Sequence, residues 1–185
     1  MSGSGTFRLI GRKLAGRFVR QQNGAAAVEF ALVAAPFLAL LFAIMETALV
    51  FFAEQTLETA TADSARLIMT GQAQTATPAY TASNFKNAVC SRIYALFNCQ
   101  GGLYVDVQSF SSFSDVASGS TSPIQNGQFK PPNNYSPGKP GDIVLVRVFY
   151  QWPVYVSLLG LNLSNLGNNR LLTATAVFRN EPYES

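Results

Sequence analysis

The sequence predicts an α+β protein, in which a long N-terminal transmembrane helix continues into a small extracytoplasmic domain with a second helix and about three antiparallel strands. Three observations support this prediction. Residues 30–45 carry no charge, and the residues that follow keep an apolar spacing of three and four. The C-terminal half then holds short apolar stretches, partly alternating, that are typical of strands.

The apolar run is long enough to cross a membrane. From Phe30 to Ala53 the chain has 24 residues with Glu46 as their one charge, and as a helix this is about 36 Å against a hydrocarbon core of about 30 Å. No polar stripe of the kind expected on a soluble core helix appears here. An ordinary secretory signal fits less well, because its apolar core is usually about 7–15 residues long.

The distribution of charge predicts how this span is oriented. Five basic residues and no acidic ones precede Gly24, whereas the rest of the chain has eight basic and ten acidic residues. By the positive-inside rule the N-terminus lies in the cytoplasm and the bulk of the chain outside. The pI near 9.0 therefore reflects the leader and does not indicate nucleic-acid binding.

Three residues distinguish the span from a plain anchor. Pro36 removes a backbone donor and should bend the helix unless neighbouring helices compensate. Glu29 lies near the start of the span and Glu46 near its far end, and a carboxylate at mid-bilayer costs at least about 2.5–3.5 kcal/mol on insertion scales. Two interpretations of Glu46 remain open: it lies at the outer headgroup boundary, or it pairs with a polar group of a neighbouring molecule.

The helix is expected to continue beyond the membrane surface. Residues 55–69 hold good helix formers, and one helix from about Ala26 to Met69 would be about 65 Å long. The alternative is a separate short helix after a bend. The side chains expected to face a partner are Leu57, Ala60, Ser64, Leu67 and Ile68.

The sequence after residue 71 predicts one helix and three strands. After a linker at 72–82, a helix is expected at 83–97 with Thr81 or Ser83 as its cap. The strands are expected at 103–113, 142–152 and 171–179, and the second is expected to be central because it is apolar on both faces. The stretch 114–141 is expected to be a long irregular loop. Residues 155–169 are expected either to dip toward the outer leaflet or to cover the sheet.

Little in the sequence favours an enzyme. The chain has no histidine, so an ordinary Ser-His or Cys-His pair and an imidazole metal ligand are excluded, and neither a metal nor a cofactor is expected. Asp106, Asp115 and Asp142 are expected to be solvated carboxylates or turn formers. Cys90 and Cys99 both fall in the exported part, where an oxidising compartment favours a disulfide worth about 2–3 kcal/mol over two free thiols.

Residues 23–33 read NGAAAVEFALV and are followed by Ile44-Met45-Glu46. This segment resembles the TadE-like minor pilins (pseudopilins) of the tight-adherence, or Flp, type IV pilus system. Similar patterns of that family lie further along the chain, so the resemblance covers nearly all of it, and the two cysteines look like the family's pair. These patterns are Ala88-Val89-Cys90, Val105-Asp106-Val107, Gly141-Asp142-Ile143-Val144 and the terminal Phe178-Arg179-Asn180-Glu181-Pro182-Tyr183.

The resemblance implies cleavage by a prepilin peptidase between Gly24 and Ala25. Glu29 would then neutralise the new terminal ammonium of this or a neighbouring subunit, a pairing that gains strength in low dielectric. Phe30 and Glu46 would act with it in helix assembly. The domains follow as a prepilin-type leader at 1–24, a transmembrane helix at 25–54, its continuation at 55–71 and a periplasmic α+β domain at 72–185.

The implied function is that of a minor pilin-like subunit in the assembly, tip or initiation of a tight-adherence pilus, because the exported domain is far larger than the tiny major pilin. The alternative is an unprocessed inner-membrane scaffold of the same machine, and a membrane-tethered periplasmic enzyme is disfavoured. The expected partners are other pilins through the N-terminal helix, the inner-membrane assembly platform, the prepilin peptidase and membrane lipid, with no nucleic acid.

Overall fold

The computed structural model describes residues 22–93, 97–155 and 162–184. Most of the leader expected at 1–24 lies outside these residues. So do residues 94–96 of the helix expected at 83–97 and residues 156–161 of the segment 155–169.

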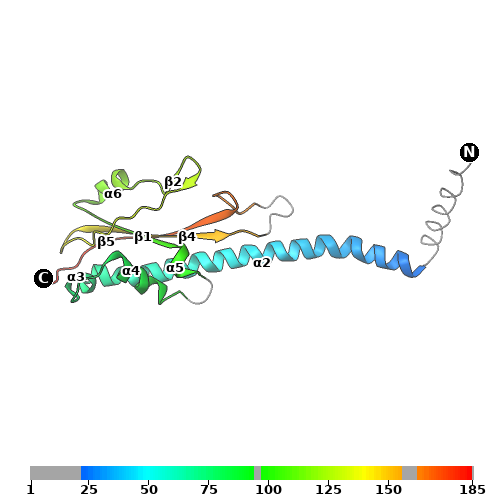
Figure 1. The fold of residues 1–185 in the computed structure, drawn as a ribbon, viewed down its shortest axis with the longest axis horizontal. Coiled ribbons are helices and arrows are strands. Elements are labelled where there is room, and N and C mark those ends of the chain that lie inside the picture. The colour runs from blue at the N-terminus through cyan, green and yellow to red at the C-terminus, as the bar shows by residue number, and fades with distance from the viewer. Residues whose placement is uncertain (1–21, 94–96, 156–161, 185) are drawn as a thin grey trace, which may run out of the picture.

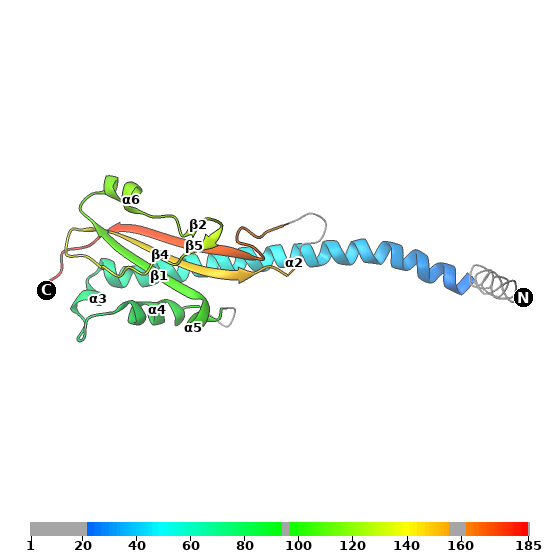
Figure 2. The ribbon, with the colours of Figure 1, turned by 45° about the horizontal axis from the view of Figure 1, so that its top comes forward.

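One helix runs through most of the length of the molecule (Figure 1). Helix α2 extends from Gln22 to Met69, 48 residues, and passes Pro36 without interruption. It is gently curved in both ribbon views (Figures 1 and 2). It ends at Met69, two residues before Gly71, whose φ of 78° only glycine adopts readily. The prediction of one continuous helix is therefore confirmed, and the alternative of a separate short helix is wrong.

The C-terminal domain is built on a three-stranded antiparallel sheet in the order β1-β4-β5. These strands are Leu103–Phe110, Ile143–Pro153 and Asn169–Arg179. β4 is rich in β-branched and aromatic residues, and its first eight residues are all buried. The prediction that this strand is central is confirmed, and it ends at Pro153, which cannot donate to a ladder.

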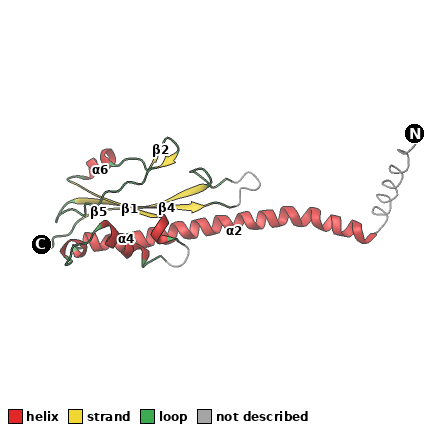
Figure 3. Cartoon of the chain, in the orientation of Figure 1, coloured by secondary structure: helices red, strands yellow, loops and turns green. Residues whose placement is uncertain are grey.

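The sheet is covered on both faces (Figure 3). On one face lie α2 and three short helices, α3 (Gln72–Thr75), α4 (Ala82–Cys90) and α5 (Cys99–Gly102). On the other lie α6 (Phe113–Gly119) and a small hairpin of β2 (Ile124–Gln125) and β3 (Gln128–Phe129). Between the helices and the sheet is the main core, whose largest fully buried members include Leu57, Ile68, Phe85, Val89, Leu103, Val107, Val146, Val148 and Leu172.

The prediction that residues 114–141 are irregular is only partly right. This stretch contains most of α6 and the β2–β3 hairpin, and Phe129 packs on Phe149 of the central strand with 6.0 Å between ring centroids. The hairpin turn is Asn126-Gly127, both at positive φ, which is the pair favoured in two-residue hairpin loops.

Helix α4 is shorter than predicted. Thr81 caps it in a reciprocal arrangement with Asn84, as expected, but the helix ends at Cys90 and does not reach residue 97. The disulfide explains the difference. A helix continued from Cys90 to Cys99 would separate their Cα atoms by about 13 Å, too far for a bridge, whereas the observed separation is 5.8 Å.

Candidate functional site

The first part of α2 stands clear of the domain. From Gly24 to Phe52, a segment called here the apolar half, nearly every large side chain is exposed, and Phe30 is 74% exposed. The helix meets the length and apolarity required of a membrane span. Gly24 is partly exposed, and Ala25 and Glu29 are exposed. The exposed large residues are Val28, Phe30, Leu32, Val33, Phe37, Leu38, Leu40, Leu41, Phe42, Ile44, Met45, Leu49, Phe51 and Phe52.

The rest of α2, from Ala53 to Met69, forms the spine of the domain and is called here the core half. It packs against β4 and β5 on one side and against α4 on another. Leu57, Ala60, Ser64 and Ile68 are buried and Leu67 is half-buried, so the predicted contact stripe is confirmed.

The domain contacts α2 at Glu46, inside the apolar half. Glu46 is 8% exposed, and its Oε1 accepts a hydrogen bond of 2.6 Å from the backbone N–H of Tyr155, just past β4. Eight residues further on, Glu54 pairs with Arg170 of β5 at 3.7 Å. Sequence reasoning did not foresee a partner for Glu46 within its own chain, and its role in assembly stays a prediction.

The far end of α2 is held by the C-terminal residues. The backbone N–H of Glu181 donates to the carbonyl of Met69 at 2.8 Å, and Asn180 is buried and donates from its side chain to the carbonyls of Pro137 and Lys139. The ring of Tyr183 lies where a Cβ at Gly71 would be. The C-terminal residues 180–183 therefore fasten the end of α2 to the domain.

The two cysteines form the predicted disulfide. It joins the end of α4 to α5, the single turn that leads into β1. Next to it Phe97 packs edge-on against Tyr150 with ring centroids 4.7 Å apart, and the hydroxyl of Tyr150 accepts a hydrogen bond from the backbone N–H of Asn98. The bridge therefore fixes the connection between the helical layer and the sheet.

A buried ion pair lies on the opposite face of the sheet. Asp106 is fully buried, and Arg147, its partner in register on β4, donates to its Oδ2 from Nη2 at 2.7 Å and from Nε at 3.0 Å. Gln108 and Asn134 also donate to Asp106. The expectation of a solvated carboxylate is wrong here, because the chain of residues 111–141 covers this face and Arg147 bonds the carbonyl of Thr121.

The other two aspartates behave as turn formers. Asp142 accepts a hydrogen bond from the backbone N–H of Lys139. Asp115, at the start of α6, accepts from the hydroxyls of Ser112 and Ser111, and these bonds hold the pKa of Asp115 below its usual value. Both fit the sequence-based expectation. Among the residues that the structure describes, no group of three His, Cys, Asp or Glu side chains is placed to hold a metal ion.

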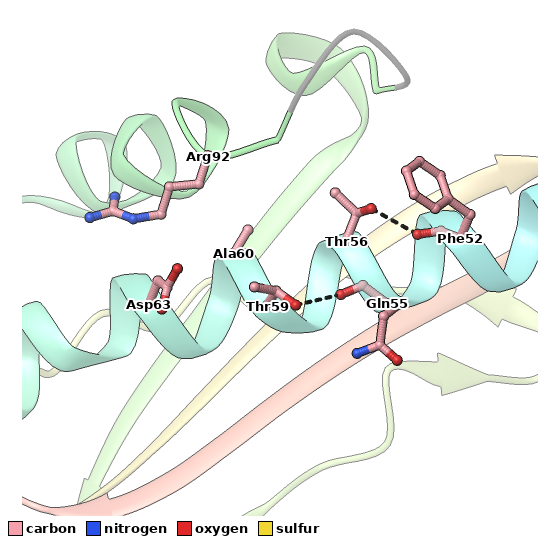
Figure 4. A pocket seen from close by; sticks show the side chains of 7 residues that line it. All are labelled: Phe52, Gln55, Thr56, Thr59, Ala60, Asp63 and Arg92. Atoms are coloured by element: carbon pink, nitrogen blue, oxygen red, sulfur yellow. Dashed lines mark hydrogen bonds between the residues drawn. The ribbon is translucent and has the colours of Figure 1, made fainter.

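A shallow groove of about 260 Å³ runs between the core half of α2 and the end of α4 (Figure 4). Arg92 lies above it and Asp63 below. The hydroxyls of Thr56 and Thr59 donate to the carbonyls one helical turn earlier, and Arg92 donates to the carbonyl of Ala88 at 2.6 Å. These three polar groups therefore bond to the backbone of their own segments.

The comparisons with known proteins bear on α2. Residues 24–66 match the model of the family described as TadE-like protein. No curated protein and no solved structure matches the chain. The family match ends before the sheet begins, so it characterises the helix and not the domain. The match confirms the resemblance to the TadE-like family over residues 24–66, and similarity to that family indicates a protein associated with the tight-adherence pilus.

Proposed function

We propose that this chain is a minor pilin-like subunit that joins or initiates a tight-adherence pilus through the apolar half of α2. The observation that carries this proposal is the division of one helix between two surroundings. Its first part presents large apolar side chains outward, while its second part is the spine of a folded domain. In a subunit of this shape the apolar half lies in the bilayer before assembly. On assembly, its contacts with lipid are replaced by contacts with the helices of neighbouring subunits.

Lateral association in lipid cannot draw on the hydrophobic effect, because lipid tails are as apolar as the helix. Side-chain packing and polar pairs must supply it. Glu29 is the exposed carboxylate near the start of α2. After cleavage at Gly24, the ammonium of Ala25 would lie one turn earlier on the same face of the helix. Glu29 could then neutralise its own ammonium or that of a neighbour.

The proposed topology is a single-pass inner-membrane protein with a cytoplasmic N-terminus and a periplasmic domain. The five basic residues before Gly24 support this orientation. The Cys90–Cys99 disulfide supports it independently, because disulfides persist in oxidising compartments such as the periplasm.

Processing is tested by extracting the protein from membranes of cells that contain the prepilin peptidase and determining its N-terminus. A start at Ala25 is expected. An intact Met1 in those cells would favour the alternative, an unprocessed scaffold of the same machine.

Assembly is tested by replacing Glu29 with Gln. We expect fewer pili by electron microscopy, with membrane insertion unchanged. The matched control is Glu58→Gln, since Glu58 is an exposed carboxylate on the core half of the same helix, and normal piliation is expected there. Normal piliation in the Glu29 variant would overturn the charge-pairing mechanism.

A further inference from the structure

We infer that the base of the C-terminal domain rests in the outer headgroup layer of the membrane, where Tyr155 contacts lipid beside α2. This inference rests on the proposed function only in requiring that the apolar half spans a bilayer. It adds a contact between the domain itself and lipid, so that the domain is seated on the membrane and does not stand away from it on the helix.

The domain meets α2 at the level of Glu46. Tyr155 donates its backbone N–H to Glu46, and Ala43 and Val50 on the same side of the helix are buried. The helix is exposed and apolar on its other sides at this level, at Ile44, Met45 and Leu49. The domain therefore contacts α2 within the apolar half as well as along the core half.

The length of the apolar half sets the depth of Glu46 in the bilayer. Exposed apolar side chains continue to Phe51 and Phe52, and the next charged group is the partly exposed Glu54–Arg170 pair. From Gly24 to Phe52 the helix rises about 42 Å, close to the 40–45 Å of a bilayer with its headgroups. Glu46 then lies about 9 Å below Phe52, near the boundary between the hydrocarbon and the outer headgroups.

The domain presents an aromatic side chain at that depth. Tyr155 is 84% exposed. Tyrosine and tryptophan favour the membrane interface, because one end of the side chain is apolar and the other polar. Trp152 lies three residues earlier at the end of β4, half-buried, with its ring centroid 5.7 Å from that of Phe97. Tyr155 adjoins the apolar half of α2 through its bond to Glu46, and we therefore assign its exposed side chain to lipid.

This placement explains why Glu46 accepts a hydrogen bond from the domain. A carboxylate near the hydrocarbon boundary loses much of its hydration. The N–H of Tyr155 replaces one of those lost partners and holds the end of β4 at the same depth.

The experiment uses the full chain in lipid vesicles with one tryptophan at position 155. Trp152 is the chain's one tryptophan, so the variant Trp152→Phe/Tyr155→Trp carries a single probe. We expect its emission to be quenched by lipids brominated near the headgroup and to be shielded from aqueous iodide. The matched control is Trp152→Phe/Ser118→Trp, with its probe exposed on α6 at the far end of the domain (Figure 1), where iodide should quench and brominated lipid should not.

Two results would overturn the inference. One is iodide quenching at position 155 equal to that of the control, with no quenching by lipid. The other is protection from both quenchers that grows with the protein-to-lipid ratio, because a second copy would then cover Tyr155. The unmodified protein gives an independent measurement, since shallow brominated lipid should also quench Trp152.

Failure of this inference is distinguishable from failure of the proposed function. Vesicles are washed in alkaline carbonate before the measurement. Protein that stays in the vesicles but shows no lipid quenching at position 155 contradicts only the seating of the domain. Protein that washes off contradicts the membrane span, and with it the proposed function.

Discussion

The two halves of α2 have the same secondary structure and opposite surroundings. The apolar half presents phenylalanine and leucine outward, whereas the core half buries mainly small side chains. Ala53, Ala60, Ser64 and Ala65 on the core half allow the sheet and α4 to approach the helix closely. Side-chain size along a continuous helix therefore separates the part that packs within the domain from the part left open to lipid or to other helices.

The difference also concerns what each half contributes to folding. The core half shares a buried cluster with β1, β4 and β5, so the free energy of unfolding of the domain should depend on it. The apolar half shares few side chains with that cluster, and substitutions there should change assembly or insertion while leaving the domain folded. Each prediction below tests one side of this comparison in the full chain in detergent.

The largest expected effect lies in the domain, at Arg147. Arg147→Met leaves Asp106 buried without its ion-pair partner, and breaking a buried pair in this way typically costs about 3–5 kcal/mol. Urea unfolding followed by circular dichroism measures it. The double variant Asp106→Leu/Arg147→Met should recover most of the loss, because no buried charge remains. Glu29→Gln in the apolar half should leave the unfolding transition unchanged. A comparable loss of unfolding free energy in that variant would contradict the proposed difference between the two halves.

The next effect compares two leucines on the same helix. Leu57→Ala in the core half removes a fully buried side chain and should destabilise the domain by about 2–5 kcal/mol. Leu41→Ala is the matched change in the apolar half, where the side chain is exposed, and should leave the unfolding midpoint nearly unchanged. Equal shifts in the two variants would mean that the halves form one cooperative unit.

The disulfide should have a smaller effect. Cys90→Ser/Cys99→Ser removes the cross-link between α4 and α5, and the chain-entropy model gives about 2–3 kcal/mol for so short a loop. The unfolding midpoint should fall, while membrane insertion, which depends on the apolar half, should be unchanged. A variant that no longer inserts would show that the two regions are coupled through the bridge.

The difference between the two halves of α2 is predictable from the sequence, because the residue pattern of each half indicates its surroundings. Sixteen residues without charge precede Glu46, and the spacing of Leu57, Ala60, Ser64 and Ile68 follows the helical period. The central strand is equally predictable, since Ile143 to Tyr150 are nearly all apolar. Such signals lie within a single element, so no knowledge of tertiary contacts is needed to find them.

Features that depend on contacts between distant segments are not predicted. Asp106 and Arg147 are 41 positions apart and meet only through the register of β1 and β4. The signal available was a matched pattern, Val-Asp-Val on one strand and Val-Arg-Val on the next. The contact of Tyr155 with Glu46 spans 109 positions and has no such signal. The β2–β3 hairpin did have one, in Asn126-Gly127.

The smallest expected effect is a dependence on pH confined to the domain. Burial, with a smaller contribution from Tyr80, raises the pKa of Tyr135 to about 12. Its ring lies 6.2 Å from that of Phe85, and among the residues that the structure describes its buried hydroxyl has no hydrogen-bond partner.

Because the folded-state pKa lies above the unfolded value of about 10, the stabilisation from Tyr135 is present below about pH 10 and is lost as the pH rises toward 12. Tyr135→Phe removes this titration and, with no hydrogen bond to lose, should change stability little at neutral pH. Between about pH 9 and about pH 11 the unfolding midpoint of the unmodified protein should therefore fall further than that of the variant. Parallel decreases would show that the hydroxyl of Tyr135 is solvated in the folded domain. If this pH dependence of the unfolding midpoint disappeared in the Leu57→Ala variant, the burial of Tyr135 would instead depend on packing by the core half of α2.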